Sequence, residues 1–327
     1  MGSDITDDID ISMPALWRAW QAFARGKARS PGLRMFYWNL EHQLLVLEQA
    51  LASGTYHHHP YQNFIVHDPK RRDIAVASIR DRVVHRLLYE HLVIKWDKTF
   101  SYDSWSCRPQ KGLIGAINRA QSHARRYRHG WIWRSDITRF FDSVDHARLC
   151  FILRTKLAHD SRAYKLLDTV IASYQTNAGD SPRGIPIGNL TSQIFANIYL
   201  NEFDQFVHST LRPLGYVRYG DDFVLWCRDE AAAQEARIVG SQFLCDYLHL
   251  AVNPAHDTVQ AAAQRLACLG VELWPTGRRL PAKTHRRIQR KRSVHNLSSY
   301  EALIAHHLPT RYVRRSRWET LDILEEV

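Results

Sequence analysis

The sequence has no run of about 18 uncharged apolar residues, so we expect no membrane-spanning helix. Its acidic start, MGSDITDDIDIS, lacks the apolar stretch of a secretory signal, which predicts a cytoplasmic protein. The five cysteines form no C-x-x-C pair, and this favours reduced, buried thiols over disulfides or a zinc site. No linker rich in Pro, Gly or Ser divides the chain, so we expect one continuous assembly of lobes.

The composition points to a folded protein that binds an acidic partner. Hydrophobic residues make up 45% of the 327 residues, which is enough for a core and excludes wholesale disorder. The formal net charge is +11, and residues 275–327 hold 12 Lys and Arg against five Asp and Glu, a net +7. This concentration of positive charge is typical of a nucleic-acid-binding surface.

The hydrophobic periodicity predicts a mixture of helices and strands. Leucines at spacings of three and four predict a helix in residues 36–54, and a similar stripe predicts another in residues 79–96. Residues 60–76 read as an extended stretch with a basic turn, and residues 191–211 as a long helix. Residues 216–227, YVRYGDDFVLWC, alternate on both sides of Gly-Asp and predict a β-hairpin.

Three aspartates occur where strands are predicted to end. Asp136 closes the apolar strand WIWRSD, and Asp221 and Asp222 occupy the hairpin tip. If these strands are neighbours, the carboxylates converge, and such a cluster is costly unless a cation such as Mg²⁺ occupies it. An isolated Asp-Asp pair is more often a solvated turn. The order strand-Asp, then the GIPIGN loop and a helix, then a Tyr-x-Asp-Asp-type hairpin argues for a site.

In this order the chain resembles the palm of a reverse transcriptase. The matching blocks include RDRVVHRLL, SYDSWSCRPQKGLIGAI, RSDITRFFDSVDH, GIPIGNLTSQIFANIYLNEFD, RYGDDFVLW and LACLGVELW, between residues 70 and 274. The resemblance implies that Asp136 and Asp221 are the principal metal ligands, that Asp222 is the third catalytic carboxylate and that the carbonyl of Ile137 completes one coordination shell. It implies two Mg²⁺ ions, with Mn²⁺ as a substitute, in an in-line phosphoryl transfer from a dNTP.

The fold implied is α+β, a right-hand polymerase with fingers, palm and a short thumb, and with a ferredoxin-like palm sheet. We expect an N-terminal helical region at 1–60, fingers at 61–130, a palm at 131–274 that includes finger helices at 147–183, and a basic thumb at 275–327.

The resemblance also assigns residues to the incoming nucleotide. Phe141 matches the aromatic steric gate that excludes a 2′-OH, with a core aromatic as the alternative. Lys70 and Arg72 match a fingertip that contacts the triphosphate, or they form an ordinary solvated turn. Ile187 and Gln193 stand where many relatives have Gln and Pro. Because Ile187 cannot hydrogen-bond a nucleotide, we expect looser or differently specified nucleotide alignment.

Further residues are assigned to the template and primer. The nucleic-acid-binding set consists of Arg108, Lys111, Arg286, Arg287, Arg290, Lys291 and Arg292. The GVELW segment resembles a primer grip, which a plain hairpin would also fit. His256 stands near a position where relatives carry a lysine that protonates pyrophosphate; the alternative is a surface turn. We interpret His57, His58 and His59 as loop residues, because consecutive side chains do not converge on a metal.

The features most resemble single-domain bacterial reverse transcriptases. The defence-associated type, which copies a companion noncoding RNA during phage infection, is the preferred reading. Diversity-generating retroelement enzymes, with error-prone cDNA synthesis, are the first alternative. Template-independent or protein-primed DNA synthesis and a non-catalytic nucleic-acid-binding scaffold are further alternatives. The expected partners are an RNA template, a DNA product and dNTPs, with a second protein or a second copy of the chain as a further option, and no membrane.

Overall fold

The computed structural model describes residues 8–27, 30–67, 71–176 and 181–291. The chain forms two compact units that are each built from separated segments. The first unit contains residues 1–101, 137–205 and 242–251, and the second contains residues 102–136, 206–241 and 252–327. The four-part division expected from the sequence stays a prediction.

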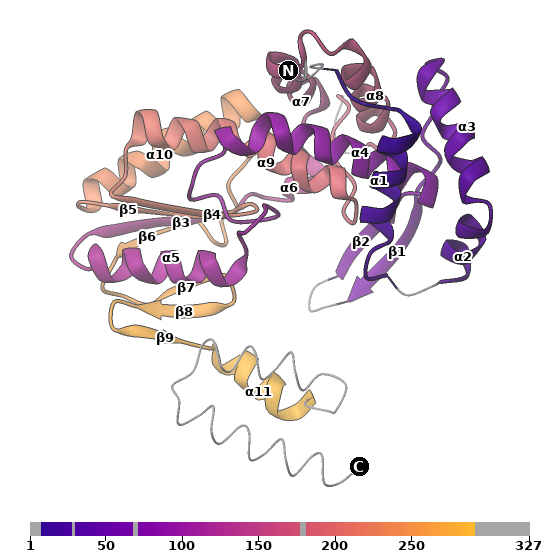
Figure 1. The fold of residues 1–327 in the computed structure, drawn as a ribbon. Coiled ribbons are helices and arrows are strands. Elements are labelled where there is room, and N and C mark those ends of the chain that lie inside the picture. Colours follow the sequence, from indigo (N-terminus) through magenta and orange to yellow (C-terminus); the bar gives the residue numbers. More distant parts are fainter. Residues whose placement is uncertain (1–7, 28–29, 68–70, 177–180, 292–327) are drawn as a thin grey trace, which may run out of the picture. The chain divides into compact units, whose positions relative to one another are not determined.

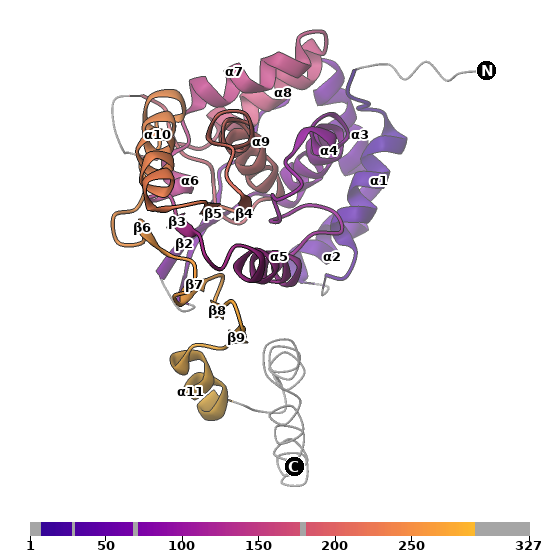
Figure 2. The same ribbon diagram turned by 90° about the vertical axis from the view of Figure 1, so that its left-hand side faces the viewer.

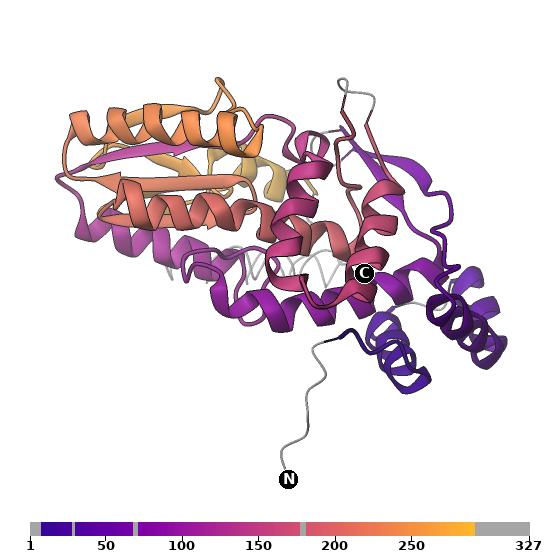
Figure 3. The same ribbon diagram turned by 90° about the horizontal axis from the view of Figure 1, so that it is seen from above.

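The first unit is mainly helical. Its helices are α1 (Met13–Ala24), α2 (Pro31–Trp38), α3 (Leu40–Ala52), α4 (Ile79–Trp96), the short α6 (Phe140–Ser143), α7 (His146–Leu157), α8 (Ser161–Ala172) and α9 (Leu190–Phe206), and a single 3₁₀ turn, η1 (Asp97–Thr99), follows α4. Helix α1 packs against α3 and α4, and α7 packs against α8 (Figures 2 and 3). Side-chain caps begin α4 at Ser78, α7 at Asp145 and α8 at Asp160, where each oxygen accepts a backbone N–H.

A two-stranded hairpin joins these helices. Strands β1 (Gln62–His67) and β2 (Arg71–Val76) pair antiparallel. Asn189 fixes β2 from the loop before α9, because its side-chain amide donates to the carbonyl of Ala75 at 2.7 Å and its oxygen accepts the N–H of Ala77 at 3.1 Å. Asn189 is buried, so these two bonds satisfy polar groups that water cannot reach.

The second unit is built on an antiparallel sheet in the order β4-β5-β3-β6 (Figure 1). The strands and helices of this unit are α5 (Leu113–Arg126), β3 (Trp131–Ser135), the π-helical turn η2 (Val207–Leu211), β4 (Gly215–Tyr219), β5 (Asp222–Cys227), the first part of α10 (Glu230–Leu248), β6 (Thr258–Ala261), β7 (Leu266–Cys268), β8 (Val271–Trp274), β9 (Gly277–Arg279) and α11 (Ala282–Lys291). Strands β7, β8 and β9 form a separate three-stranded sheet.

Helix α5 lies between the two sheets of this unit (Figure 1). Its small residues Ala116 and Ala120 share one apolar core with Ile132 and Trp226 of the larger sheet and with residues of the smaller one, such as Leu273. Small side chains let the helix approach both sheets closely. This packing supports the strands that carry the candidate site.

Helix α10 supports the same sheet through a close approach at Gly240. A Cβ atom at this position would lie 2.6 Å from the Trp133 ring on β3, so only glycine fits here without a shift. The Trp133 indole N–H also donates to Asp257 at 2.7 Å, which fixes the ring from the loop before β6. Trp133 is fully buried.

Most elements expected from the sequence are confirmed. Residues 79–96 are helical as predicted, the hairpin at 216–227 and the strand before Asp136 are present, and the three consecutive histidines lie in a loop. All five cysteines are free, but the expectation that they are buried is wrong for Cys107 and Cys245, which are exposed. None of the helices in the described part of the chain is apolar over a length sufficient to cross a bilayer.

A partly buried polar cluster joins the loop before β1 to α4. The ring nitrogens of His58 and His85 lie 3.1 Å apart, and the other His58 nitrogen lies 2.6 Å from the carbonyl of His59. Because a carbonyl only accepts, His58 donates to it, and a neutral His58 then accepts from His85. Thr191 then donates its hydroxyl to the remaining His85 nitrogen at 3.3 Å. With both histidines neutral, each of these bonds has one donor and one acceptor.

We predict that acid weakens this cluster. Burial lowers the pKa of His85 to about 3, and burial also lowers the pKa of His58. The unfolded chain, with histidine pKa values near ~6.5, therefore binds more protons, so this contribution is complete above pH ~6.5 and is lost as the pH falls. Between pH 7.5 and 5, His85 should remove about 2 kcal/mol of unfolding free energy in urea titrations.

A control separates the contribution of His85 to the pH dependence of stability from the contributions of other groups. His85→Gln should show a smaller pH dependence than the wild type, whereas replacing the exposed His159 by Gln should leave the dependence unchanged. An identical pH dependence in wild type and His85→Gln would contradict the assignment.

Candidate active site

Three aspartates meet at one end of the larger sheet. Tyr219 pairs with Asp222 across the β4–β5 hairpin, which leaves Gly220 and Asp221 as its two-residue turn, and Gly220 has the positive φ of +65° that such a turn requires. Ser135 of β3 pairs with Phe223 of β5. Continuing this register by one residue places Asp136 opposite Asp222. The sheet therefore brings together carboxylates that are about 85 residues apart in the chain.

The electrostatics of this cluster are unfavourable without a cation. Burial, and after it the neighbouring charges of Asp222 and Asp136, raise the pKa of Asp221 to about 6. Burial likewise raises the pKa of Asp222, with the charge of Asp136 acting in the same direction. Like charges held together away from water disfavour ionisation, as expected of carboxylates that share a site.

The donor atoms fit a divalent cation. One carboxylate oxygen of Asp136, Oδ1, is buried and has no hydrogen-bond partner in the structure, while Oδ2 lies 2.8 Å from Nδ1 of His256. A buried carboxylate oxygen without a donor is costly unless a cation approaches it. Within the described residues, no group of three or more His, Cys, Asp or Glu side chains lies in an arrangement that could hold a metal ion.

Two arginines that the sequence analysis did not assign hold the site in place. Arg218, which is buried, donates to the carbonyl of Gly220 at 2.9 Å and to the hydroxyl of Ser104 at 2.9 Å. It therefore fixes the turn that carries Asp221, and its charge lowers the pKa of that carboxyl. Arg134 approaches Asp222 at 3.4 Å. The signal for both was available, since an arginine inside an apolar strand just before an aspartate is unusual.

His256 is closer to the site than a surface turn would require. It follows the turn at Asn253, whose backbone N–H donates to the carbonyl of Asp136 at 2.9 Å. This backbone bond and the contact between His256 and Asp136 fix the aspartate from two directions. The structure thus places His256 beside the Asp136 carboxylate, whereas its role in protonating pyrophosphate stays a prediction.

The residues predicted to contact the nucleotide lie in the first unit. Phe140 is buried and Phe141 is only partly buried, so Phe140 is the core aromatic of the pair. Ile187 is partly buried, and its carbonyl accepts the N–H of Ala75 on β2 at 3.1 Å. Gln193 is exposed on α9, and Arg72 is exposed on β2. Lys70 lies outside the described residues.

The residues predicted to bind nucleic acid lie in the second unit. Lys111 donates to the carbonyl of Tyr102 at 2.8 Å, and Arg108 donates to the carbonyl of Ser104 at 3.1 Å, so both also fix their own loop. Helix α11 carries the exposed residues Arg286, Arg287 and Arg290, and it ends at Lys291. Arg292 and the rest of the predicted thumb lie outside the described residues.

An antiparallel sheet flanked by helices, with convergent carboxylates at one end, is the arrangement of the palm of a right-hand polymerase. The model of the family described as reverse transcriptase (RNA-dependent DNA polymerase) matches residues 67–273, more than half of the chain. The chain therefore belongs to the reverse transcriptase family. The α+β polymerase fold predicted from the sequence is confirmed.

Several known proteins are similar to parts of the chain. Protein YkfC of Escherichia coli is 26% identical over 64% of this chain and 66% of YkfC. The group II intron-encoded protein LtrA of Lactococcus lactis is 26% identical over 51% of this chain and 28% of LtrA. The chain thus spans less than two thirds of these relatives. A telomerase from Candida albicans, solved with a fragment of telomeric RNA, superposes with a TM-score of 0.50 over 81% of this chain and 54% of the telomerase at 13% identity, which shows the shared fold.

We predict that Asp221→Asn stabilises the metal-free protein. The folded-state pKa of about 6 lies above the unfolded value of 3.8, so the ionised carboxylate opposes folding once the pH rises through this interval. Removing the charge should increase the free energy of unfolding in EDTA at pH 7.5 by about 2 kcal/mol, after allowing for partial exposure. Urea unfolding measures this gain.

Added Mg²⁺ should reverse the order of stability of the wild type and Asp221→Asn. Added Mg²⁺ should stabilise the wild type more than Asp221→Asn, because the wild-type cluster carries the charge that the ion neutralises. A matched control is Asp246→Asn, which removes an exposed carboxylate hydrogen-bonded to Gln242. If that control responded like Asp221→Asn, the effect would reflect net charge and not the cluster.

Proposed function

We propose that this protein is an RNA-templated DNA polymerase that uses two Mg²⁺ ions. The observation that carries the proposal is the cluster of Asp136, Asp221 and Asp222, with its raised carboxyl pKa values and one buried carboxylate oxygen that lacks a donor. Membership in the reverse transcriptase family supports RNA as template and DNA as product.

The roles of the residues follow from this arrangement. Asp136, Asp221, Asp222 and the carbonyl of Ile137 would hold the two ions, and Mn²⁺ would be accepted by the same oxygen donors. When bound, the ions would activate the primer 3′-hydroxyl and neutralise the departing pyrophosphate. The protein contributes a turn fixed by Arg218, which keeps the Asp221 carboxylate in place, and an Asp136 carboxylate oriented by His256.

Discrimination between nucleotides is assigned to the first unit. Phe141 would exclude ribonucleotides, and Arg72 and Lys70 would neutralise the triphosphate. Ile187 and Gln193 would contact the incoming nucleotide, although Ile187 lacks the side-chain amide that many relatives have at its position. Support for the first role comes from Phe141 itself, since it remains partly exposed while its neighbour is buried.

For the biological role we propose copying of a companion noncoding RNA in bacterial antiphage defence, in the cytoplasm. This step rests on the resemblance of the sequence blocks to defence-associated enzymes. Its test is sequencing of the RNA and the cDNA that copurify with the protein from infected cells. A template repeat with adenine-directed errors would instead identify a diversity-generating enzyme.

We predict carboxylate-dependent DNA synthesis. Purified protein with a primed RNA template, Mg²⁺ and labelled dNTPs should extend the primer, and Asp221→Ala should lower the rate at least ~100-fold because the cation loses a ligand. Asp246→Asn is the matched control and should retain activity. Extension that is equal in wild type and Asp221→Ala would defeat the proposed function.

Phe141→Ala should weaken discrimination against ribonucleotides. Without the ring the sugar pocket accepts a 2′-OH, and the ratio of kcat/KM for dATP to that for ATP should fall by about tenfold or more, equivalent to ~1.4 kcal/mol. Single-nucleotide extension measures the ratio. A conservative Phe141→Tyr exchange should retain discrimination, and an unchanged ratio in Phe141→Ala would place the gate elsewhere.

Ile187→Gln should change the error spectrum. The introduced amide can hydrogen-bond the incoming nucleotide and should reduce misincorporation on a defined template, as measured by sequencing the products. Ile187→Leu, which adds no polar group, serves as the control. Identical error spectra for wild type and Ile187→Gln would remove any role for this position in nucleotide alignment.

A further inference from the structure

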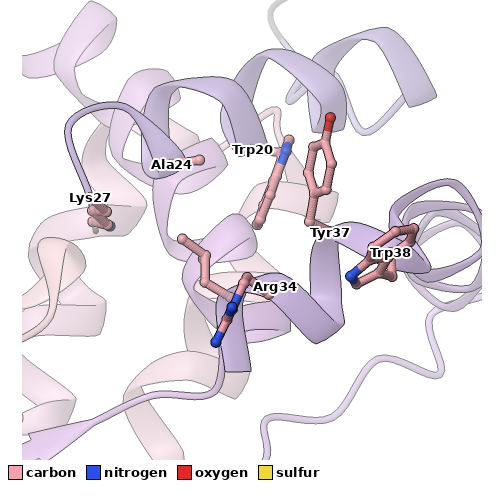
Figure 4. A pocket seen from close by; sticks show the side chains of 7 residues that line it. Trp20, Ala24, Lys27, Arg34, Tyr37 and Trp38 are labelled. Carbon is pink, nitrogen blue, oxygen red and sulfur yellow. The ribbon is translucent and has the colours of Figure 1, made fainter. Parts of the chain in front are cut away.

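A cavity outside the catalytic cluster lies between α1 and α2 in the first unit (Figure 4). Its volume is about 350 Å³, within the range of small-molecule sites. The lining residues are Trp20, Ala24, Lys27, Leu33, Arg34, Tyr37 and Trp38. Aromatic rings and cations therefore surround one hollow on the surface.

Of the aromatic residues that line the cavity, Trp20 is buried, whereas Tyr37 and Trp38 are exposed. Trp20 is buried, and its ring stacks on Phe36 with centroids 5.0 Å apart and meets Phe23 at 5.8 Å. Figure 4 shows Tyr37 beside Trp20 and Trp38 further along the helix. Tyr37 is 67% exposed and Trp38 is 84% exposed. Large aromatic faces left in water at a cavity rim are available to stack on a planar ligand.

The charges at the cavity are all positive. Lys27 and Arg34 line it, Lys27 lies 3.2 Å from the centroid of the Phe23 ring, and the guanidinium of Arg82 lies 5.7 Å from the same centroid. Within the described residues, Lys27, Arg34 and Arg82 form no ion pair with a carboxylate. Burial and the charges of Arg82 and Arg86 lower the pKa of Lys27 to about 8, so an anion placed here would relieve cation repulsion.

We propose that this cavity binds one unstacked nucleotide of a single-stranded RNA, with the base on Tyr37 and Trp38 and its phosphate at Lys27 and Arg34. The combination of aromatic faces with unpaired cations is the chemistry by which proteins hold single strands, since every base has a stacking face and every nucleotide a negative charge. An apolar peptide would leave the cations unpaired, and a duplex would keep its bases stacked. The identity of the strand as RNA template rests on the proposed function.

The test is binding of a fluorescent 12-nucleotide RNA to the full chain, without dNTPs, by anisotropy. The double variant Tyr37→Ala/Trp38→Ala should weaken binding about tenfold or more. Lys27→Gln/Arg34→Gln should weaken it as well and reduce the slope of log affinity against log salt by about one to one and a half. The same RNA annealed into a blunt duplex should bind wild type and both variants alike.

Matched controls use neighbouring residues outside the cavity. Met35→Ala removes another exposed apolar side chain of α2, and Arg18→Gln removes one positive charge from α1; both should bind like the wild type. Equal affinity of single-stranded RNA for the double aromatic variant and wild type would overturn the proposal, as would an equal loss for single strand and duplex. AMP that binds the cavity as tightly as the 12-nucleotide RNA would also overturn it, because the site would then serve a free nucleotide.

The result of the RNA-binding test does not depend on catalysis. Asp221→Asn should retain the full affinity for RNA, because its substitution leaves the cavity unchanged. Absence of incorporation by the wild type, together with RNA binding that the cavity variants weaken, would therefore count against the proposed function alone. Incorporation by the wild type together with unaltered RNA binding in the aromatic variant would count against the cavity alone.

Discussion

The architecture of the second unit depends on holding like charges together. Asp136, Asp221 and Asp222 are brought to one end of a sheet, where burial and mutual repulsion raise the pKa of Asp221 to about 6. Such a cluster opposes folding until a cation neutralises it. The surrounding structure must therefore supply the stability that the site removes, and it does so through rigid packing on both faces of the sheet.

The two faces of the sheet are covered in different ways. On one, α5 presents small residues to two sheets at once, and on the other, α10 approaches β3 so closely that Gly240 has no room for a side chain against Trp133. The buried guanidinium of Arg218 donates a hydrogen bond to the carbonyl of Gly220 in the turn of the hairpin. These contacts restrict the backbone around the carboxylates, and restricted ligands lose little entropy when a cation binds.

Positive charge serves more than one purpose in this chain. Arg218 and Arg134 act within the carboxylate cluster, where they limit repulsion. Arg286, Arg287 and Arg290 on α11 are exposed, as expected of groups that meet a phosphate backbone. The cations of this chain, whose net charge is +11, thus include some that hold the candidate site and some that are exposed on α11.

The sequence alone predicted most of the helices and strands and pointed to the carboxylates of the candidate site. Helical periodicity located residues 79–96, and alternation around Gly220 located the hairpin, because these patterns are local. Ordered motifs then pointed to Asp136 and Asp221.

The tertiary structure determined which residues from distant parts of the sequence lie side by side, and no local sequence pattern contains this information. The pairing of β3 with β5 sets Asp136 opposite Asp222, and the packing of separate segments brings Arg218 to the turn, His256 to Asp136 and aromatic rings to a basic cavity. The structure also shows that Phe140 is the buried aromatic of the pair and that Phe141 is only partly buried. These relations join residues far apart in the chain, and their energies exist only once the chain is folded.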